Sequence, residues 1–178
     1  MDRKTLLIWL NIGLLILAWI MALSSYDSLP ERIPTHFNFK GQPNAWGEKS
    51  PYIFFMLPVV QSLIVLLIFI LLRYTHLYNF PQKKEVRNWP DKYRQPVYDF
   101  LKLFMLLIAL LLNIMFLIIQ KMIIDSSKAG EMNPYQTWFM LIITFMWLPL
   151  IIVFFMKMNK LVAEQRRKIA HSQSGQLS

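Results

Sequence analysis

The chain has 178 residues, of which 56% are apolar, 15% are aromatic and only 16% are charged. An ordinary soluble domain has about 25% charged residues, and a domain of this length has too much surface to hide so many apolar side chains. The composition therefore excludes a disordered chain and a plain soluble enzyme, and the lack of cysteine excludes a disulfide-based scaffold.

Four apolar runs of about twenty residues follow one another along the chain, and none has a Lys, Arg, Asp, Glu or His in its interior. A bilayer core about 30 Å thick needs about 20 helical residues to cross it. The sequence therefore predicts an all-α, multi-pass membrane protein. Its four transmembrane helices are expected at about 6–23, 52–72, 103–119 and 137–156.

The ends of these helices also have sequence signals. Ser50 and Pro51 are expected to begin the second helix, and Gln95 and Pro96 the third, because each pair places a side-chain acceptor before a proline. The four helices form one transmembrane domain over residues 1–156. The basic tail, 157–178, is expected to continue the last helix before its final polar residues.

Lys and Arg are distributed unevenly between the connections. Fourteen of the nineteen lie in the N-terminal stub, the loop 73–102 and the tail, against five in the other two connections. The positive-inside rule then places both termini and loop 73–102 in the cytoplasm, and loop 26–51 outside the cell membrane. Membrane lipids are the expected partners of the net charge of +9. We expect no nucleic-acid partner, because no compact soluble segment presents this charge.

Small and polar residues recur on one face of the first and third runs, where close helix packing is expected. Those faces carry Asn11, Ala18 and Ala22 in the first run, and Ala109, Asn113 and Gln120 in the third. Near mid-span, Asn113, Gln61, Ser62 and Thr144 are predicted to form an interhelical hydrogen-bond cluster. The cluster is interpreted as structural, because a transport or proton-relay role would ordinarily place an ionisable residue there.

Loop 26–51 is the segment whose residues are most specific. Pro30 and Pro34 favour an extended backbone, and residues 35–40 then alternate in character. If this stretch is extended, His36, Asn38 and Lys40 point to one side and Phe37 and Phe39 to the other. Gly41, Pro43 and Gly47 are expected to form turns, with Trp46 as an interfacial anchor.

This loop resembles the signature of a bacterial and archaeal membrane family, domain of unknown function 1648, which also forms the N-terminal module of SdpI-like immunity proteins. The motif residues are Leu29, Pro30, Ile33, Pro34, His36, Phe37, Asn38, Gly41, Pro43, Trp46 and Lys49. The resemblance covers the loop and its two flanking helices. It implies a multi-pass membrane protein and, in SdpI-like relatives, a role in toxin immunity and signalling. This chain is shorter than those relatives.

A ligand site is predicted in the same loop, formed by Glu31, His36, Asn38, Lys40 and Lys49. His36 could also be structural, a metal ligand or a catalytic acid–base group with Asp27, Glu31 or Glu48. No familiar metal-binding spacing is present, so we expect no metal, no cofactor and no catalytic residue. Lys49 near a helix start opposes the helix dipole, which suggests a partner such as Glu31, Glu48 or a lipid phosphate.

These features favour a non-enzymatic sensing, binding or immunity module that uses its outer loop, with an extracellular peptide or lipid as ligand. Loop 73–102, the basic cytoplasmic loop, is a further candidate site for a protein partner. Two alternatives remain open at this point. One is an accessory subunit of a larger membrane complex, and the other is a membrane enzyme that acts on a lipid or wall precursor through His36.

Overall fold

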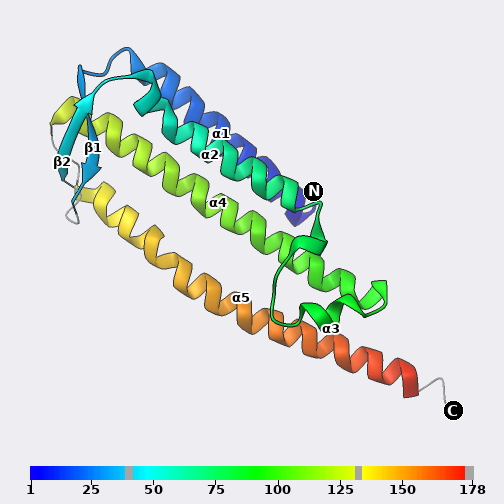
Figure 1. Ribbon diagram of the computed structural model, residues 1–178. Coiled ribbons are helices and arrows are strands. Elements are labelled where there is room, and N and C mark those ends of the chain that lie inside the picture. Colours follow the sequence, from blue (N-terminus) through cyan, green and yellow to red (C-terminus); the bar gives the residue numbers. More distant parts are fainter. Residues whose placement is uncertain (39–41, 131–133, 175–178) are drawn as a thin grey trace.

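A computed structural model describes residues 1–38, 42–130 and 134–174 (Figure 1). Four of its helices are long and apolar enough to cross a membrane, which confirms the predicted four-helix transmembrane architecture. A small antiparallel hairpin lies between the first two. The elements are α1 (Arg3–Tyr26), β1 (Arg32–Phe37), β2 (Pro43–Glu48), α2 (Pro51–Leu71), the 3-10 turn η1 (Thr75–Leu77), α3 (Lys83–Arg87), α4 (Asp91–Ala129) and α5 (Pro134–Ser174).

Side-chain caps and proline explain where two of these helices begin. The Asp2 carboxylate accepts a hydrogen bond from the Thr5 backbone N–H at 2.8 Å, and this bond lowers the pKa of Asp2. Ser50 Oγ accepts from the Ile53 N–H at 3.2 Å, as the sequence predicts for α2. The expectation for the third span is wrong, because α4 already begins at Asp91 and contains Pro96.

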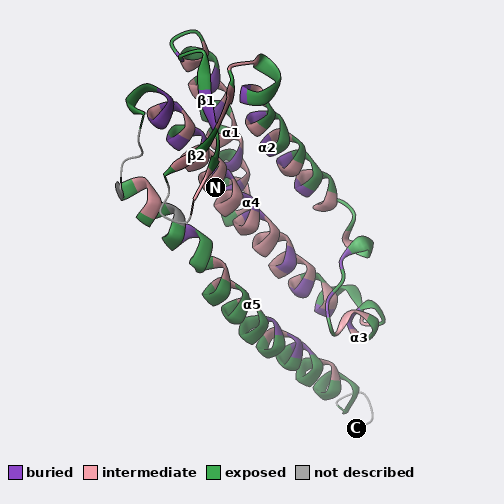
Figure 2. Ribbon diagram, turned by 60° about the vertical axis from the view of Figure 1, so that its left-hand side comes forward, coloured by how far each residue is buried: buried purple, intermediate pink, exposed green. Residues whose placement is uncertain are grey.

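Helix α4 is the centre of the fold. It packs against α1, α2, α5 and strand β1, and Figure 1 shows it running between the α1–α2 pair and α5. The small residues predicted for close packing are buried there, including Ala18, Ala22 and Ala109, each with no exposed surface. By contrast, most of α5 is exposed along its length (Figure 2).

A chain of buried amide side chains joins the three closely packed helices. Gln61 Nε2 in α2 donates to Asn113 Oδ1 in α4 at 2.7 Å, and Asn113 Nδ2 donates to Asn11 Oδ1 in α1, also at 2.7 Å. Asn11 Nδ2 in turn donates to the carbonyl oxygens of Leu7 (2.8 Å) and Leu106 (3.2 Å). The predicted cluster thus includes Asn113 and Gln61, and Asn11 completes it.

The other two residues of that predicted cluster lie elsewhere. Ser62 accepts a hydrogen bond from Trp19 Nε1 at 3.0 Å and donates to the Pro58 carbonyl at 2.7 Å. Thr144 is exposed on α5, so its predicted place in the cluster is wrong. A fourth buried amide, Gln120, donates to the Ala18 carbonyl at 3.2 Å and forms a second link between α4 and α1.

The end of the bundle opposite the hairpin has a compact apolar core. Its buried residues come from the segment after α2 and from α3, α4 and α5: Tyr78, Phe80, Val86, Val97, Leu101, Met158 and Val162. Two hydrogen bonds from Arg166 to the Glu85 carboxylate, at 2.8 and 2.7 Å, join α5 to α3. These bonds hold the pKa of Glu85 below its usual value. Residues 157–174 of the basic tail therefore belong to α5.

Replacement of Asn113 by Leu is expected to lower the free energy of unfolding by about 1–2 kcal/mol, because Gln61 and Asn11 then lose their shared partner in a region without water. Thermal or denaturant unfolding in a defined lipid environment measures the change. Thr144→Leu, on the exposed face of α5, is the control and is expected to have little effect. Equal losses in both variants would contradict a structural role for the amide chain.

Candidate functional site

The hairpin of β1 and β2 is fixed to the bundle through one face. Arg32 pairs with Glu48, Ile33 with Gly47 and Pro34 with Trp46, before the register shifts at His36. Ile33 is 1% exposed and packs with residues of α1, α2 and α4, namely Ala22, Phe54 and Ile124, and with Leu29. A two-stranded hairpin is marginally stable alone, so its order depends on this contact.

Lys49 joins the end of the hairpin to the end of α1. Its backbone N–H donates to the Glu31 carbonyl at 2.6 Å, and its ammonium donates to the Leu29 carbonyl at 2.8 Å. The same ammonium lies 5.3 Å from the centre of the Tyr26 ring, a cation–π distance. These contacts explain a lysine at the start of a helix without an acidic side chain or a lipid phosphate.

His36 and Asn38 hold the turn end of the hairpin. The His36 imidazole is hydrogen-bonded to the Asn44 side-chain oxygen. Asn38 accepts a bond from the Gln42 N–H at 3.0 Å on its side chain and donates its own N–H to the Gln42 carbonyl at 2.9 Å. Of the other predicted residues here, Phe39, Lys40 and Gly41 lie outside the described residues. In the part of the chain that is described, no three His, Asp or Glu side chains are grouped as metal ligands would be.

An open groove lies along the other end of the hairpin, with a volume of about 640 Å³. Its lining contains two carboxylates, two cations and one indole, contributed by Glu31, Arg32, Trp46, Glu48 and Lys49. Two of the predicted ligand-site residues, Glu31 and Lys49, are therefore brought together here. His36 is four residues from Arg32, or about 13 Å along the strand, so it lies away from this groove.

The backbone of β2 offers further hydrogen-bonding groups at this end of the hairpin. The Lys49 N–H bond to Glu31 fixes the alternation of the antiparallel ladder, in which every second pair is hydrogen-bonded. Trp46 and Glu48 belong to the other pairs, so their N–H and C=O groups are directed away from β1. The sheet of the described residues has two strands, and this edge of β2 has no neighbouring strand.

Of the residues that line this groove, sequence reasoning selected Glu31 and Lys49 for the ligand site but did not select Arg32, Trp46 and Glu48 together. Arg32 and Glu48 face each other across the ladder. The residues of the groove could have been found by predicting that two six-residue strands pair across a short connection. That pairing would have put residues 31–32 beside 46–49. Gly47 and Pro43 instead indicated turns, although the structure places both in β2.

The fold and this site define a multi-pass helical membrane protein with an ordered hairpin between its first two helices. Residues 13–61, which run from α1 through the hairpin into α2, match the family described as Domain of unknown function (DUF1648). The resemblance of the loop motif to this domain of unknown function is thus confirmed over residues 13–61. An uncharacterized protein of Archaeoglobus fulgidus is 28% identical over 183 residues, with 94% of each chain covered. No solved structure matches the chain.

Gly47 has a steric reason to lack a side chain. A Cβ atom added to it would lie 2.9 Å from Thr35 Cγ2 on the partner strand, and that methyl group is held by a stiff, β-branched side chain. Gly47→Ala is expected to destabilise the hairpin by about 1–3 kcal/mol, measured by hydrogen exchange of the hairpin amides. Thr35→Ser, which removes the methyl group, is expected to rescue it. A double variant as unstable as Gly47→Ala alone would contradict the steric explanation.

Because of its contacts, replacement of Lys49 is expected to destabilise the hairpin locally, whereas replacement of another charged residue of the hairpin is not. Lys49→Met removes the bond to the Leu29 carbonyl and the contact with Tyr26, so local opening of residues 29–36 is expected to cost about 1–2 kcal/mol less. Hydrogen exchange measures this opening. Arg32→Met removes the same charge from an exposed position and is expected to leave the protection unchanged. A similar loss in both variants would indicate a general charge effect.

Proposed function

We propose that this protein is a non-enzymatic binding module of the cell membrane that captures an extended peptide along β2. The distribution of Lys and Arg supports an orientation with the hairpin outside and both termini in the cytoplasm, because fourteen of nineteen basic residues belong to the segments at the opposite end or in the tail. The groove would then meet ligands that arrive at the outer surface.

The observation that carries this proposal is that one end of the hairpin combines an open groove, lined from both strands, with an edge of β2 that has no neighbouring strand among the described residues. Trp46 and Glu48 line the groove with their side chains and direct backbone groups to the same edge. An extended peptide can add a strand to such an edge, where backbone bonds supply affinity and side-chain contacts supply specificity. The groove continues from β2 to β1, where Glu31 and Arg32 add charges of both signs for long side chains of the peptide.

Several features favour a peptide over the other ligands considered. A lipid headgroup would use the charges but not the row of backbone donors and acceptors on β2. A hydrolytic enzyme would need its acid–base group beside the substrate, whereas His36 is bonded to Asn44 at the far end of the hairpin. Capture of a toxic peptide at this edge would be similar to the role in toxin immunity that the resemblance implies for SdpI-like relatives.

Photo-crosslinking in living cells tests the proposal. With a photoreactive amino acid at position 48, we expect a discrete adduct in which mass spectrometry identifies one extended peptide segment. The same group at position 27, which is exposed near the end of α1, serves as the positional control and is expected to give no such adduct.

A charge variant makes this experiment specific. Arg32→Gln is expected to weaken the adduct at position 48 by about fivefold or more, because one charge-assisted bond is lost. Lys128→Gln removes another exposed positive charge near the hairpin end of α4 and is expected to leave the yield unchanged. Adducts with lipid alone, or equal adducts at positions 27 and 48, would refute peptide capture by β2. A crosslink to the folded surface of another membrane protein would instead indicate an accessory subunit.

A further inference from the structure

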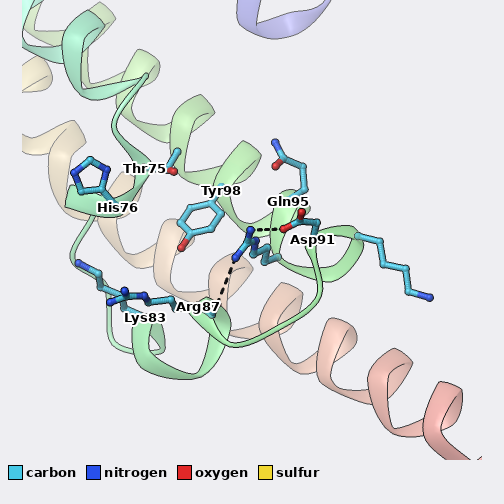
Figure 3. A pocket seen from close by; sticks show the side chains of 9 residues that line it. Thr75, His76, Lys83, Arg87, Asp91, Gln95 and Tyr98 are labelled. Atoms are coloured by element: carbon cyan, nitrogen blue, oxygen red, sulfur yellow. Dashed lines mark hydrogen bonds and ion pairs between the residues drawn. The ribbon is translucent and has the colours of Figure 1, made fainter.

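A second, strongly basic pocket lies at the end of the bundle opposite the hairpin (Figure 3). Its volume is about 730 Å³, and it is formed by η1, α3 and the first two turns of α4. Four cationic side chains and one carboxylate contribute to its wall, namely Lys83, Arg87, Lys92, Arg94 and Asp91. The pocket is separate from the hairpin groove and uses none of its residues.

The acidic and the basic side chains of α3 lie on different faces of this short helix. Glu85 faces α5, where Arg166 neutralises it through two hydrogen bonds. Lys83 and Arg87 are four residues apart, share the other face of the helix and line the pocket. Among the described residues, neither Lys83 nor Arg87 forms an ion pair.

Arg94 is held in place between the two walls of the pocket. Its guanidinium forms an ion pair with Asp91 and donates to the Arg87 carbonyl at 3.5 Å, as the dashed lines in Figure 3 indicate. Asp91 therefore compensates Arg94, while the charges of Lys83 and Arg87 remain uncompensated on the facing wall. The pocket as a whole therefore has an excess of positive charge, which favours the binding of an anion.

Neutral donors lie among these cations. Figure 3 shows the Tyr98 side chain among Thr75, His76 and Arg87. The Tyr98 ring is positioned by contacts with Tyr78 and Phe80, with ring centres 6.4 and 6.3 Å apart. Hydroxyl groups beside guanidinium and ammonium groups form a donor set that suits the oxygens of a phosphate group.

The depth of the pocket places it at the membrane surface. The apolar run of α4 begins near Leu103, so Tyr98 lies about 7.5 Å and Arg94 about 13.5 Å beyond the hydrocarbon core along the helix. The headgroup layer of one leaflet is about 5–8 Å thick. Tyr98 is therefore at the outer boundary of the headgroup layer, and Arg94 lies beyond this layer, in water.

We infer that this pocket binds a phosphate group, held by Lys83 and Arg87 with a hydrogen bond from Tyr98. An anionic lipid headgroup and a soluble phosphate present the same chemistry to these residues. The site is distinct from diffuse attraction of basic residues to a charged membrane. Two uncompensated cations and a phenol positioned by ring contacts line one pocket, whereas a diffuse effect depends only on the total charge.

The test uses the full chain in lipid nanodiscs with two probes. In the first arm, phosphatidic acid is added to phosphatidylcholine nanodiscs, and native mass spectrometry measures its retention. In the second arm, inorganic phosphate is titrated into nanodiscs of phosphatidylcholine alone, and phosphorus NMR measures binding. We expect saturable binding of at least one probe. Retention of lipid alone identifies a headgroup site, binding of phosphate alone identifies a soluble ligand, and binding of both shows recognition of the phosphate group itself.

Matched variants decide whether the pocket is responsible. Lys83→Gln with Arg87→Gln is expected to weaken binding by about tenfold or more. The control, Lys84→Gln with Lys160→Gln, removes the same charge from exposed positions that do not line the pocket, and it is expected to stay within about twofold of the unmodified protein.

Tyr98→Phe keeps the ring contacts and removes only the hydroxyl, so a loss of about fivefold is expected with unchanged thermal stability. This variant keeps the inference testable if the double variant fails to fold. Equal losses in the double variant and its control, full binding by Tyr98→Phe, or no binding of either probe to the unmodified protein would overturn the inference.

Discussion

The amide chain from Gln61 through Asn113 to Asn11 is the interaction on which the rest of this structure depends. Within a bilayer, packing of apolar side chains gives little preference for one helix over another, because lipid tails are as apolar as leucine. Buried amides do give such a preference, since each unpaired donor would remain unsatisfied in a medium without water. Asn113 bonds to both neighbours, and this fixes α4 against α1 and α2 at one depth and one rotation.

The position of the hairpin follows from that arrangement. Once α4 is fixed, its far end places Ile124 beside Ala22 and Phe54, and these three side chains form the surface on which Ile33 is buried. The hairpin has too few residues for a core of its own and uses the core of the bundle instead. Its buried face therefore provides stability, and its exposed groove and strand edge are available for recognition. Lys49 contributes to both, because it holds the α1 end in place and also lines the groove.

The sequence predicted well those parts of the fold in which a residue type has a single structural role in its context. Small and amide residues in an apolar run mark helix contacts, and Ala18, Asn11 and Asn113 are buried as expected. Residues with several possible uses were less informative. Thr144 is near mid-span, but most of α5 is exposed, so its hydroxyl does not reach the amide chain. Pro96 marked a helix start by its chemistry, yet α4 includes it in its second turn. The groove was only partly predictable, because Arg32 and Glu48 come together only through the pairing of β1 with β2, and the sequence analysis had expected turns at Pro43 and Gly47.

Helix α4 also determines how its two ends can communicate. Tyr98 in the basic pocket and Ile124 beneath the hairpin are 26 residues apart, or about 39 Å along one helix. A ligand at one end can influence the other only if it prefers one of two arrangements of the elements between them. Sliding or rotation of α4 would break both bonds of Asn113, so α4 is a poor moving part. Helix α5 is less restrained at mid-span and is joined to α3 beside the basic pocket through Arg166 and Glu85. Any coupling between the two ends would therefore require a change in the position of α5 relative to the unit of α1, α2 and α4.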